Sequence, residues 1–224
     1  MKNCCQHVVS AVLLVVSLVT AASATDWPTW RFDAGRSAST PEKLPASMNL
    51  QWTRVLPALK PAWPEDPRLN FDASYEPVVA GETLFYGSSR NDSVTAVDLK
   101  SGKQRWRFFA EGPVRFAPLV HKGRVYFGAD DGALYCLDAQ SGSLQWRFLA
   151  APTSRKVIGS ERVISVWPVR GGPLLVNGRI HFTVGVWPFE GTFLYSLDPE
   201  SGQVAGGQQV DSATGSTIEH DVIT

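Results

Sequence analysis

The chain has 224 residues, of which 44% are hydrophobic and 11% aromatic, enough to build one or two packed cores. Its 21 basic residues balance its 21 acidic residues, and no block of like charge occurs. The composition therefore gives no support to electrostatic binding of nucleic acid or of an anionic membrane surface.

Residues 1–24 have the pattern of a signal peptide. Lys2 provides a positive start, residues 7–20 are mainly apolar, and Ala22-Ser23-Ala24 is a small-x-small cleavage signal. The apolar run is shorter than the roughly 20 residues that span a bilayer. We expect cleavage before Thr25 and an exported protein, periplasmic or extracellular, without a transmembrane segment. An uncleaved membrane anchor is the alternative.

Two of the three cysteines, Cys4 and Cys5, belong to this signal peptide. Because Cys136 is then the remaining cysteine, we expect neither an internal disulfide nor a cysteine-based metal site. An export signal without disulfides fits a bacterial envelope compartment best.

The N-terminal segment, residues 25–76, contains Leu50-Gln51-Trp52, which repeats Leu144-Gln145-Trp146. We expect residues 50–54 to form an outer β-strand of the kind that completes the last blade of a closed ring.

Three repeats follow. The stretches PVVAGETLFYG from Pro77, PLVHKGRVYFG from Pro118 and PLLVNGRIHFT from Pro173 align without a gap. Downstream, VDLKSGKQRWRF at 97–108 and LDAQSGSLQWRF at 137–148 lie 40 residues apart. Each repeat reads as four short antiparallel strands joined by turns, with Asn177-Gly178 as a type I′ hairpin signal. A period near 40 of this kind predicts an all-β protein of β-propeller blades, at 77–110, 118–150 and 173–210.

The sequence of the repeats resembles that of the pyrroloquinoline-quinone-like repeat family, whose tryptophan-docking pattern is Ala-x-Asp-x-x-x-Gly-Lys-x-x-Trp. The first repeat matches it at every position, the second has Cys and Ser in place of Ala and Lys, and the third keeps only the Asp and the Gly. The matching residues are Ala96, Asp98, Gly102, Lys103 and Trp106, then Cys136, Asp138, Gly142 and Trp146, then Asp198 and Gly202.

The resemblance implies a structural role for these residues. The Gly permits a positive φ, the Asp caps the turn, and the Trp docks against the neighbouring blade. Cys136, in the small-residue position, is expected to be a packing residue.

Departures from the repeat are the candidate binding loops. The insertion 151–172 carries Arg155, Lys156, Trp167 and Arg170, and the loop within the third repeat carries Trp187. The loops offer aromatic faces to a quinone, a sugar or a partner protein, or they fold down and cover the blades. Both readings stay open.

About three blades leave the ring open, and the tail 211–224 has no periodic pattern, so we expect it to be disordered or truncated. We expect the sequence to be a fragment of a longer propeller, or an open arc that assembles with another chain.

The resemblance also extends to quinoprotein dehydrogenases, in which a calcium ion, a catalytic Asp, an adjacent-cysteine disulfide and a stacking Trp surround the quinone. None can be assigned to a position here, so we expect no cofactor, no metal site and no catalytic residue. The leading prediction is a non-catalytic binding or scaffolding module, whose partners are other envelope proteins or the remaining blades. The alternatives are a fragment of a quinoprotein oxidoreductase that binds pyrroloquinoline quinone with Ca²⁺, and carbohydrate binding through the Trp-Pro loops.

Overall fold

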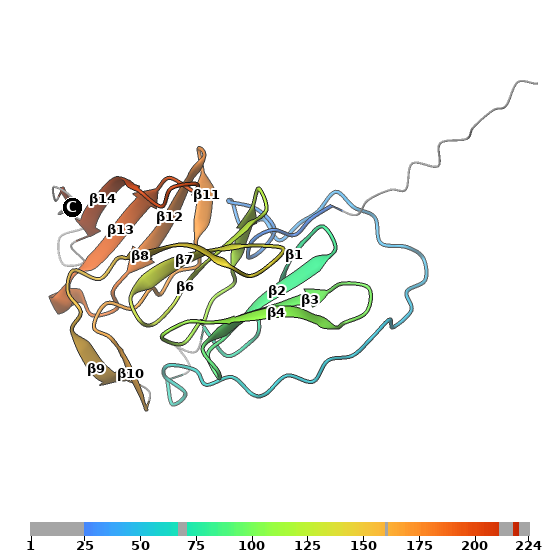
Figure 1. Cartoon of the computed structure of the whole chain (residues 1–224), viewed down its shortest axis with the longest axis horizontal. Helices are drawn as coiled ribbons and strands as arrows, with labels where there is room; N and C mark the ends of the chain where they lie inside the picture. The colour runs from blue at the N-terminus through green and yellow to red at the C-terminus, as the bar shows by residue number, and fades with distance from the viewer. Residues whose placement is uncertain (1–24, 67–70, 160, 211–216, 220–224) are drawn as a thin grey trace, which may run out of the picture.

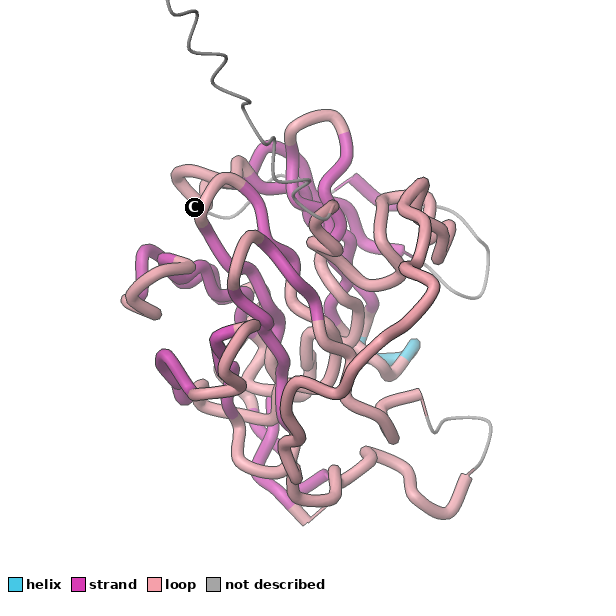
Figure 2. Tube along the Cα trace, turned by 90° about the vertical axis from the view of Figure 1, so that its right-hand side faces the viewer, coloured by secondary structure: helices cyan, strands magenta, loops and turns pink. Residues whose placement is uncertain are grey.

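The computed structural model describes residues 25–66, 71–159, 161–210 and 217–219, so the expected signal peptide lies outside the described residues. The described chain consists of β-strands and loops, with one 3-10 turn at Pro188–Glu190 (Figure 2). The prediction of an all-β fold is confirmed.

Three antiparallel sheets, one for each repeat, make up the body of the molecule (Figure 1). The first contains β1 (Val78–Ala80), β2 (Thr83–Ser88), β3 (Ser93–Asp98) and β4 (Gln104–Phe109). The second contains β5 (Leu119–His121), β6 (Arg124–Gly128), β7 (Ala133–Asp138) and β8 (Leu144–Leu149). The third contains β11 (Leu174–Val176), β12 (Arg179–Val184), β13 (Thr192–Leu197), β14 (Val204–Val210) and β15 (Thr217–Glu219). In each sheet the strands pair in chain order, as in propeller blades.

The turn between the first two strands of a repeat follows from its sequence. Asn177 and Gly178 both have positive φ, 49° and 74°, and Lys122 and Gly123 have 47° and 73°. Two consecutive left-handed residues make the type I′ turn that fits twisted hairpin strands. The hairpin signal at Asn177-Gly178 therefore predicted the structure correctly.

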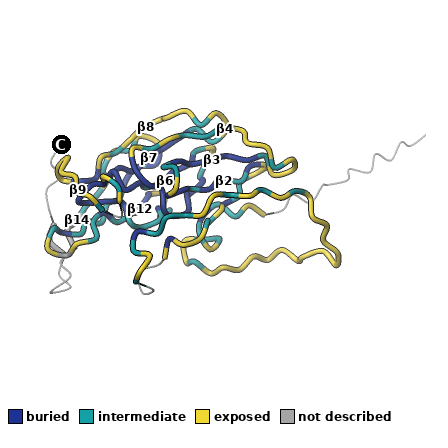
Figure 3. The backbone as a smooth tube through the Cα atoms, turned by 90° about the horizontal axis from the view of Figure 1, so that it is seen from below, coloured by how far each residue is buried: buried dark blue, intermediate teal, exposed yellow. Residues whose placement is uncertain are grey.

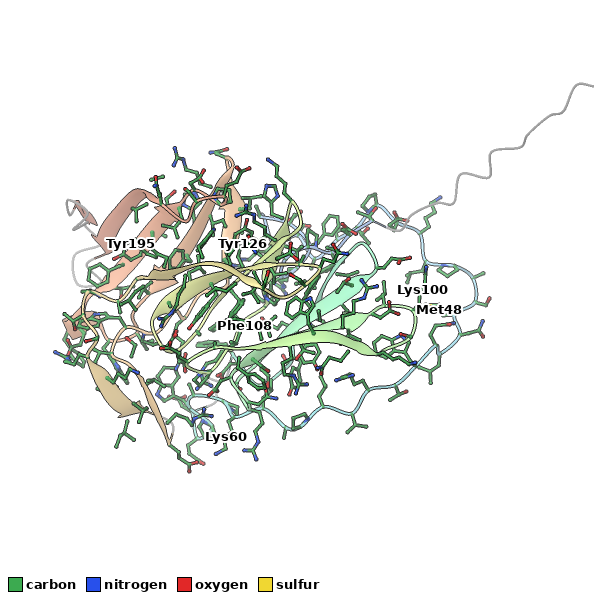
Figure 4. The ribbon with its side chains drawn as sticks, in the orientation of Figure 1. Met48, Lys60, Lys100, Phe108, Tyr126 and Tyr195 are labelled. Atoms are coloured by element: carbon green, nitrogen blue, oxygen red, sulfur yellow. The ribbon has the colours of Figure 1, made fainter. Side chains whose placement is uncertain are left out.

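The blades pack face to face through aromatic side chains. Phe108 of the first blade contacts Phe127 and Tyr135 of the second, at ring-centroid distances of 6.1 and 5.8 Å (Figure 4). Phe148 contacts Tyr195 of the third blade at 5.3 Å. The central strands are buried while β4 and β8 are largely exposed, as outer strands of blades should be (Figure 3). The three blades form an open arc and do not close a ring.

Tryptophan docking joins the blades. The Trp106 indole donates to the carbonyl oxygen of Ala139 at 3.0 Å and lies against Gly142 of the next blade. Trp146 repeats the contact, donating to the carbonyl oxygen of Pro199 at 3.3 Å and lying against Gly202. The indole covers the turn between the third and fourth strands of its neighbour in both cases.

Residues 50–54, expected as an outer strand, lie in no strand in the described structure. Trp52 nevertheless makes the same docking contact with the first blade. Its indole donates to the carbonyl oxygen of Leu99 at 2.8 Å and lies against Gly102. The Leu-Gln-Trp sequence shared by residues 50–52 and 144–146 thus reflects an equivalent docking contact of Trp52 and Trp146.

Two segments differ from expectation. Thr217–Glu219, within the tail expected to be disordered, pairs with β14 as a fifth strand of the third sheet; residues 211–216 and 220–224 of that tail lie outside the described residues. The insertion 151–172, expected as loop, contains a hairpin of β9 (Lys156–Gly159) and β10 (Arg162–Ser165). The short runs VI (157–158) and RVIS (162–165) are long enough to form this hairpin but too short to predict strands from the sequence.

Truncating a docking indole should destabilise the protein. Because Trp146 joins two blades, Trp146→Ala is expected to lower the free energy of unfolding by about 3 kcal/mol, near the lower end for large-to-small core substitutions. Urea unfolding followed by circular dichroism measures the change, and Trp187→Ala, in a partly exposed loop, is the matched control. Equal effects of the two substitutions would contradict the docking role.

Candidate binding site on the loop face

The loops between second and third strands and the links between blades emerge at one end of the sheets. This end, which we call the loop face, comprises residues 89–92, 129–132 and 185–191 together with the links 110–118 and 150–173. Backbone hydrogen bonds tie loops to links, from the Ala110 amide to the Asp92 carbonyl oxygen at 2.7 Å and from the Ala150 amide to that of Gly132 at 3.0 Å. Antiparallel strand order requires this clustering.

A buried ionic cluster lies under the loop face. Arg115, whose side chain is 2% exposed, donates from Nη1 to Asp72 at 2.6 Å and from Nε to Asp130 at 2.7 Å. The same Nη1 donates to the carbonyl oxygen of Lys60 at 2.7 Å. The cluster therefore joins the N-terminal segment to the second blade, since Asp72 and Lys60 belong to the former and Asp130 to the latter. Buried charges of this kind are tolerated only when paired and hydrogen-bonded.

Arg170 completes the cluster from the insertion. Its Nε and Nη2 donate to the two carboxylate oxygens of Asp130, at 2.7 and 2.9 Å. This bidentate pairing fixes the guanidinium plane, which lies over the Trp63 ring at 5.0 Å. Burial lowers the pKa of Arg170 from its usual value, and the nearby Asp130 opposes that shift.

An aromatic hollow opens beside this guanidinium. It has a volume of about 410 Å³ and is lined by Trp63, Phe71, Phe116, Arg170, Val186 and Trp187. Trp63 and Trp187 meet edge to face at 6.1 Å, and Trp187 stacks on Phe189. Phe71 and Phe189 are largely exposed at the surface. The arrangement combines open aromatic surface with one fixed cation.

The predicted loop residues have different positions in the structure. Arg170 and Trp187 line the hollow, whereas Trp167 is buried, and its indole donates to the carbonyl oxygen of Glu190 at 2.6 Å. Arg155 pairs with Glu190 and lies over the Trp167 ring at 5.3 Å, and Lys156 is exposed on the hairpin. Arg170 and Trp187 therefore contribute to the wall of the hollow, whereas Trp167 is part of the buried cover over the blades.

The docking-motif residues form the turns that receive the indoles. The carboxylates of Asp98, Asp138 and Asp198 each accept from the amide and the hydroxyl of the Ser three residues later, at 2.7–2.8 Å. Hydrogen bonds to the ionised form hold the pKa of Asp138 and of Asp198 below the usual value, and for Asp98 the largest cause is Arg105. Ala96 is buried opposite Trp106, and Lys103 is exposed beside the turn.

The sequence analysis did not single out Asp72, Arg115 or Asp130 as site residues. One signal was present: Arg115 interrupts the apolar link Pro113-Val114-Arg115-Phe116-Ala117, where a cation would be buried without a partner. The partner itself could not be named, because Asp72 lies 43 residues away.

The described residues contain no group of three or more His, Cys, Asp or Glu side chains positioned to hold a metal ion. The buried carboxylates of the ionic cluster, Asp72 and Asp130, instead hold guanidinium groups. These residues do not fit the calcium site that a quinone cofactor of this fold implies. The described part of the chain also has no helix long and apolar enough to cross a membrane.

Blades of four antiparallel strands, joined by docked tryptophans, define the chain as a β-propeller protein. It belongs to the PQQ-like repeat family, because the family described as outer membrane protein assembly factor BamB matches residues 16–222. The resemblance drawn from the docking motif is confirmed.

Two curated relatives are dehydrogenase subunits of quinone-type alcohol dehydrogenases, from Gluconacetobacter polyoxogenes and Komagataeibacter europaeus. Each is 29% identical over 158 residues, which cover 65% of this chain and 21% of the relative. The chain thus spans about a fifth of the length of these relatives.

Solved structures show the same fold. The quinohemoprotein alcohol dehydrogenase from Comamonas testosteroni has a TM-score of 0.60 at 21% identity, covering 86% of this chain and 28% of that one. A europium-containing methanol dehydrogenase has a TM-score of 0.58 at 15% identity, covering 83% and 32%. At these identities the likeness concerns the fold alone.

Removing Arg115 should destabilise the loop face strongly. Arg115→Met keeps the length of the side chain but leaves Asp72 and Asp130 without its guanidinium, so we expect a loss of about 3–5 kcal/mol in the free energy of unfolding. Urea denaturation measures it, with Arg105→Met, at a partly exposed ion pair, as control. A loss no larger than that of the control would contradict the ionic cluster.

Cys136 should be chemically inert in the folded protein. It is buried, and burial raises the pKa of its thiol to about 11, so the thiol stays protonated at neutral pH. We expect negligible reaction with Ellman's reagent at pH 8 until the protein is unfolded. The measurement uses a chain in which Cys4 and Cys5 are replaced by Ser, and rapid reaction of the native protein would contradict the packing role.

Proposed function

We propose that the chain serves as a non-catalytic binding or scaffolding module of the bacterial envelope, exported there by its N-terminal signal, and that the loop face is its contact surface. The family description, an outer membrane protein assembly factor, supports an envelope role. The blades supply a rigid support, and the loops supply the contacts.

The observation that carries the proposal is the aromatic hollow with its fixed guanidinium. Tryptophan and arginine dominate the energetically important positions of protein interfaces, usually in a well-packed pocket with a polar surround. Trp63, Trp187 and Arg170 supply these residue types within one hollow. Because Asp130 holds Arg170 and the ionic cluster holds Asp130, binding would require little ordering of this cation, which lowers its entropic cost.

The competing proposal is a piece of a quinone-dependent alcohol dehydrogenase, favoured by the 29% identity over 158 residues. Its active residues would then lie in the part of those relatives that this chain does not span. The engagement of Asp72 and Asp130 by arginines favours the binding module.

Cofactor binding discriminates the two proposals. The purified protein is mixed with pyrroloquinoline quinone and calcium chloride, and the absorbance of the quinone is followed through size-exclusion chromatography. We expect the protein to elute without quinone. Stoichiometric co-elution that is abolished by a calcium chelator would favour the dehydrogenase and contradict the scaffolding proposal.

A further inference from the structure

The guanidinium of Arg170 has one nitrogen left for a ligand. Nε and Nη2 are engaged by Asp130, and no hydrogen bond to Nη1 occurs among the described residues. The side chain is only 10% exposed, yet it forms part of the wall of the aromatic hollow. Nη1 is therefore the donor that Arg170 can direct to a bound group.

The charge around this donor favours an anionic acceptor. Asp130 divides its carboxylate between Arg170 and Arg115, so Arg170 shares its carboxylate partner with a second guanidinium. Asp72 is engaged by Arg115 and by the amide of Ala62. An ionised acceptor at Nη1 would form a charge-assisted hydrogen bond, which is roughly twice as strong as a bond between neutral groups.

The remaining walls favour a ring. Trp63, Phe71, Phe116 and Trp187 offer aromatic surface on several sides, and aromatic pairs gain energy from edge-to-face and offset stacking. The volume of about 410 Å³ lies near the lower end of the range for ligand pockets, about 300–1,000 Å³. The hollow has room for one ring-bearing residue and an adjacent acidic group.

We propose that the hollow binds an acidic-aromatic peptide segment of a partner protein, with an aromatic side chain packed against the exposed surfaces of Trp63 and Trp187 and an adjacent carboxylate accepting a hydrogen bond from Arg170 Nη1. The proposal rests on the proposed function and names the partner chemistry of that same site. A neutral sugar would also use the tryptophan faces, but its binding would not depend on a negative charge.

The test uses three dipeptide amides with acetylated N-termini: phenylalanyl-glutamate, its neutral isostere phenylalanyl-glutamine, and alanyl-glutamate. Binding to the wild-type protein is followed by NMR, through the indole N–H signals assigned to Trp63 and Trp187, in the presence of a calcium chelator. We expect phenylalanyl-glutamate to bind at least ten times more tightly than either of the other two. Equal binding of the glutamate and glutamine peptides, or displacement by methyl glucoside, would overturn the proposal.

Two variants extend the test. Arg170→Lys keeps the charge but not the fixed bidentate geometry, and it should weaken binding of phenylalanyl-glutamate about tenfold while leaving phenylalanyl-glutamine unchanged. Arg105→Lys, on strand β4 at a residue that does not line the hollow, should change neither. An unchanged affinity in Arg170→Lys would overturn the role of Arg170. Calcium-dependent quinone binding would defeat the proposed function separately, because the peptide titrations contain a chelator and no quinone.

Discussion

The docking of an indole onto a glycine turn is the contact on which the rest of the structure depends. It occurs three times, with Trp52, Trp106 and Trp146 lying on Gly102, Gly142 and Gly202. Each glycine has a φ near +70° and would bring a Cβ to within 2.6–2.7 Å of the indole. The residue must therefore be glycine for two independent reasons, the backbone conformation and the space needed by the ring. Spacing between blades follows from this contact.

The first blade departs from the other two at the residue before its third strand. The residue before the third strand of each blade has a positive φ: Asp92, Gly132 and Gly191 at 54°, 87° and 87°. Only in the first blade is it not glycine. Asp92 pairs with Arg162 of the inserted hairpin, yet its Oδ1 is buried without a hydrogen-bond partner, and burial raises its pKa. Asp92 is less favourable than glycine in this left-handed conformation, but its side chain links the first blade to the insertion.

The sequence predicted what recurs in it. Strand pattern, hairpin turns and docking residues are visible in the repeated sequence, because each depends on residues close together in the chain. The ionic cluster of Asp72, Arg115, Asp130 and Arg170 was not predictable, because it joins four separate segments. The two Trp-Pro dipeptides of the loops also differ: Trp167 is buried and Trp187 lines the hollow, a difference set by the surrounding fold. The strand at 217–219 escaped prediction because the tail around it has no periodic pattern.

The fold cannot decide between dehydrogenase and assembly factor, since one scaffold supports both. The loop face distinguishes the two, because Asp130 is a buried carboxylate that already accepts three hydrogen bonds from two guanidinium groups. This leaves about one of its four acceptor positions for a cation. Asp130 accepts from Arg115 and Arg170 through both of its oxygens. A calcium ion there would have to displace two arginines and leave them buried and unpaired, at a cost of several kcal/mol for each. The charge pattern of this loop face is therefore suited to a ligand that adds a negative group, and a partner with an acidic segment meets that requirement.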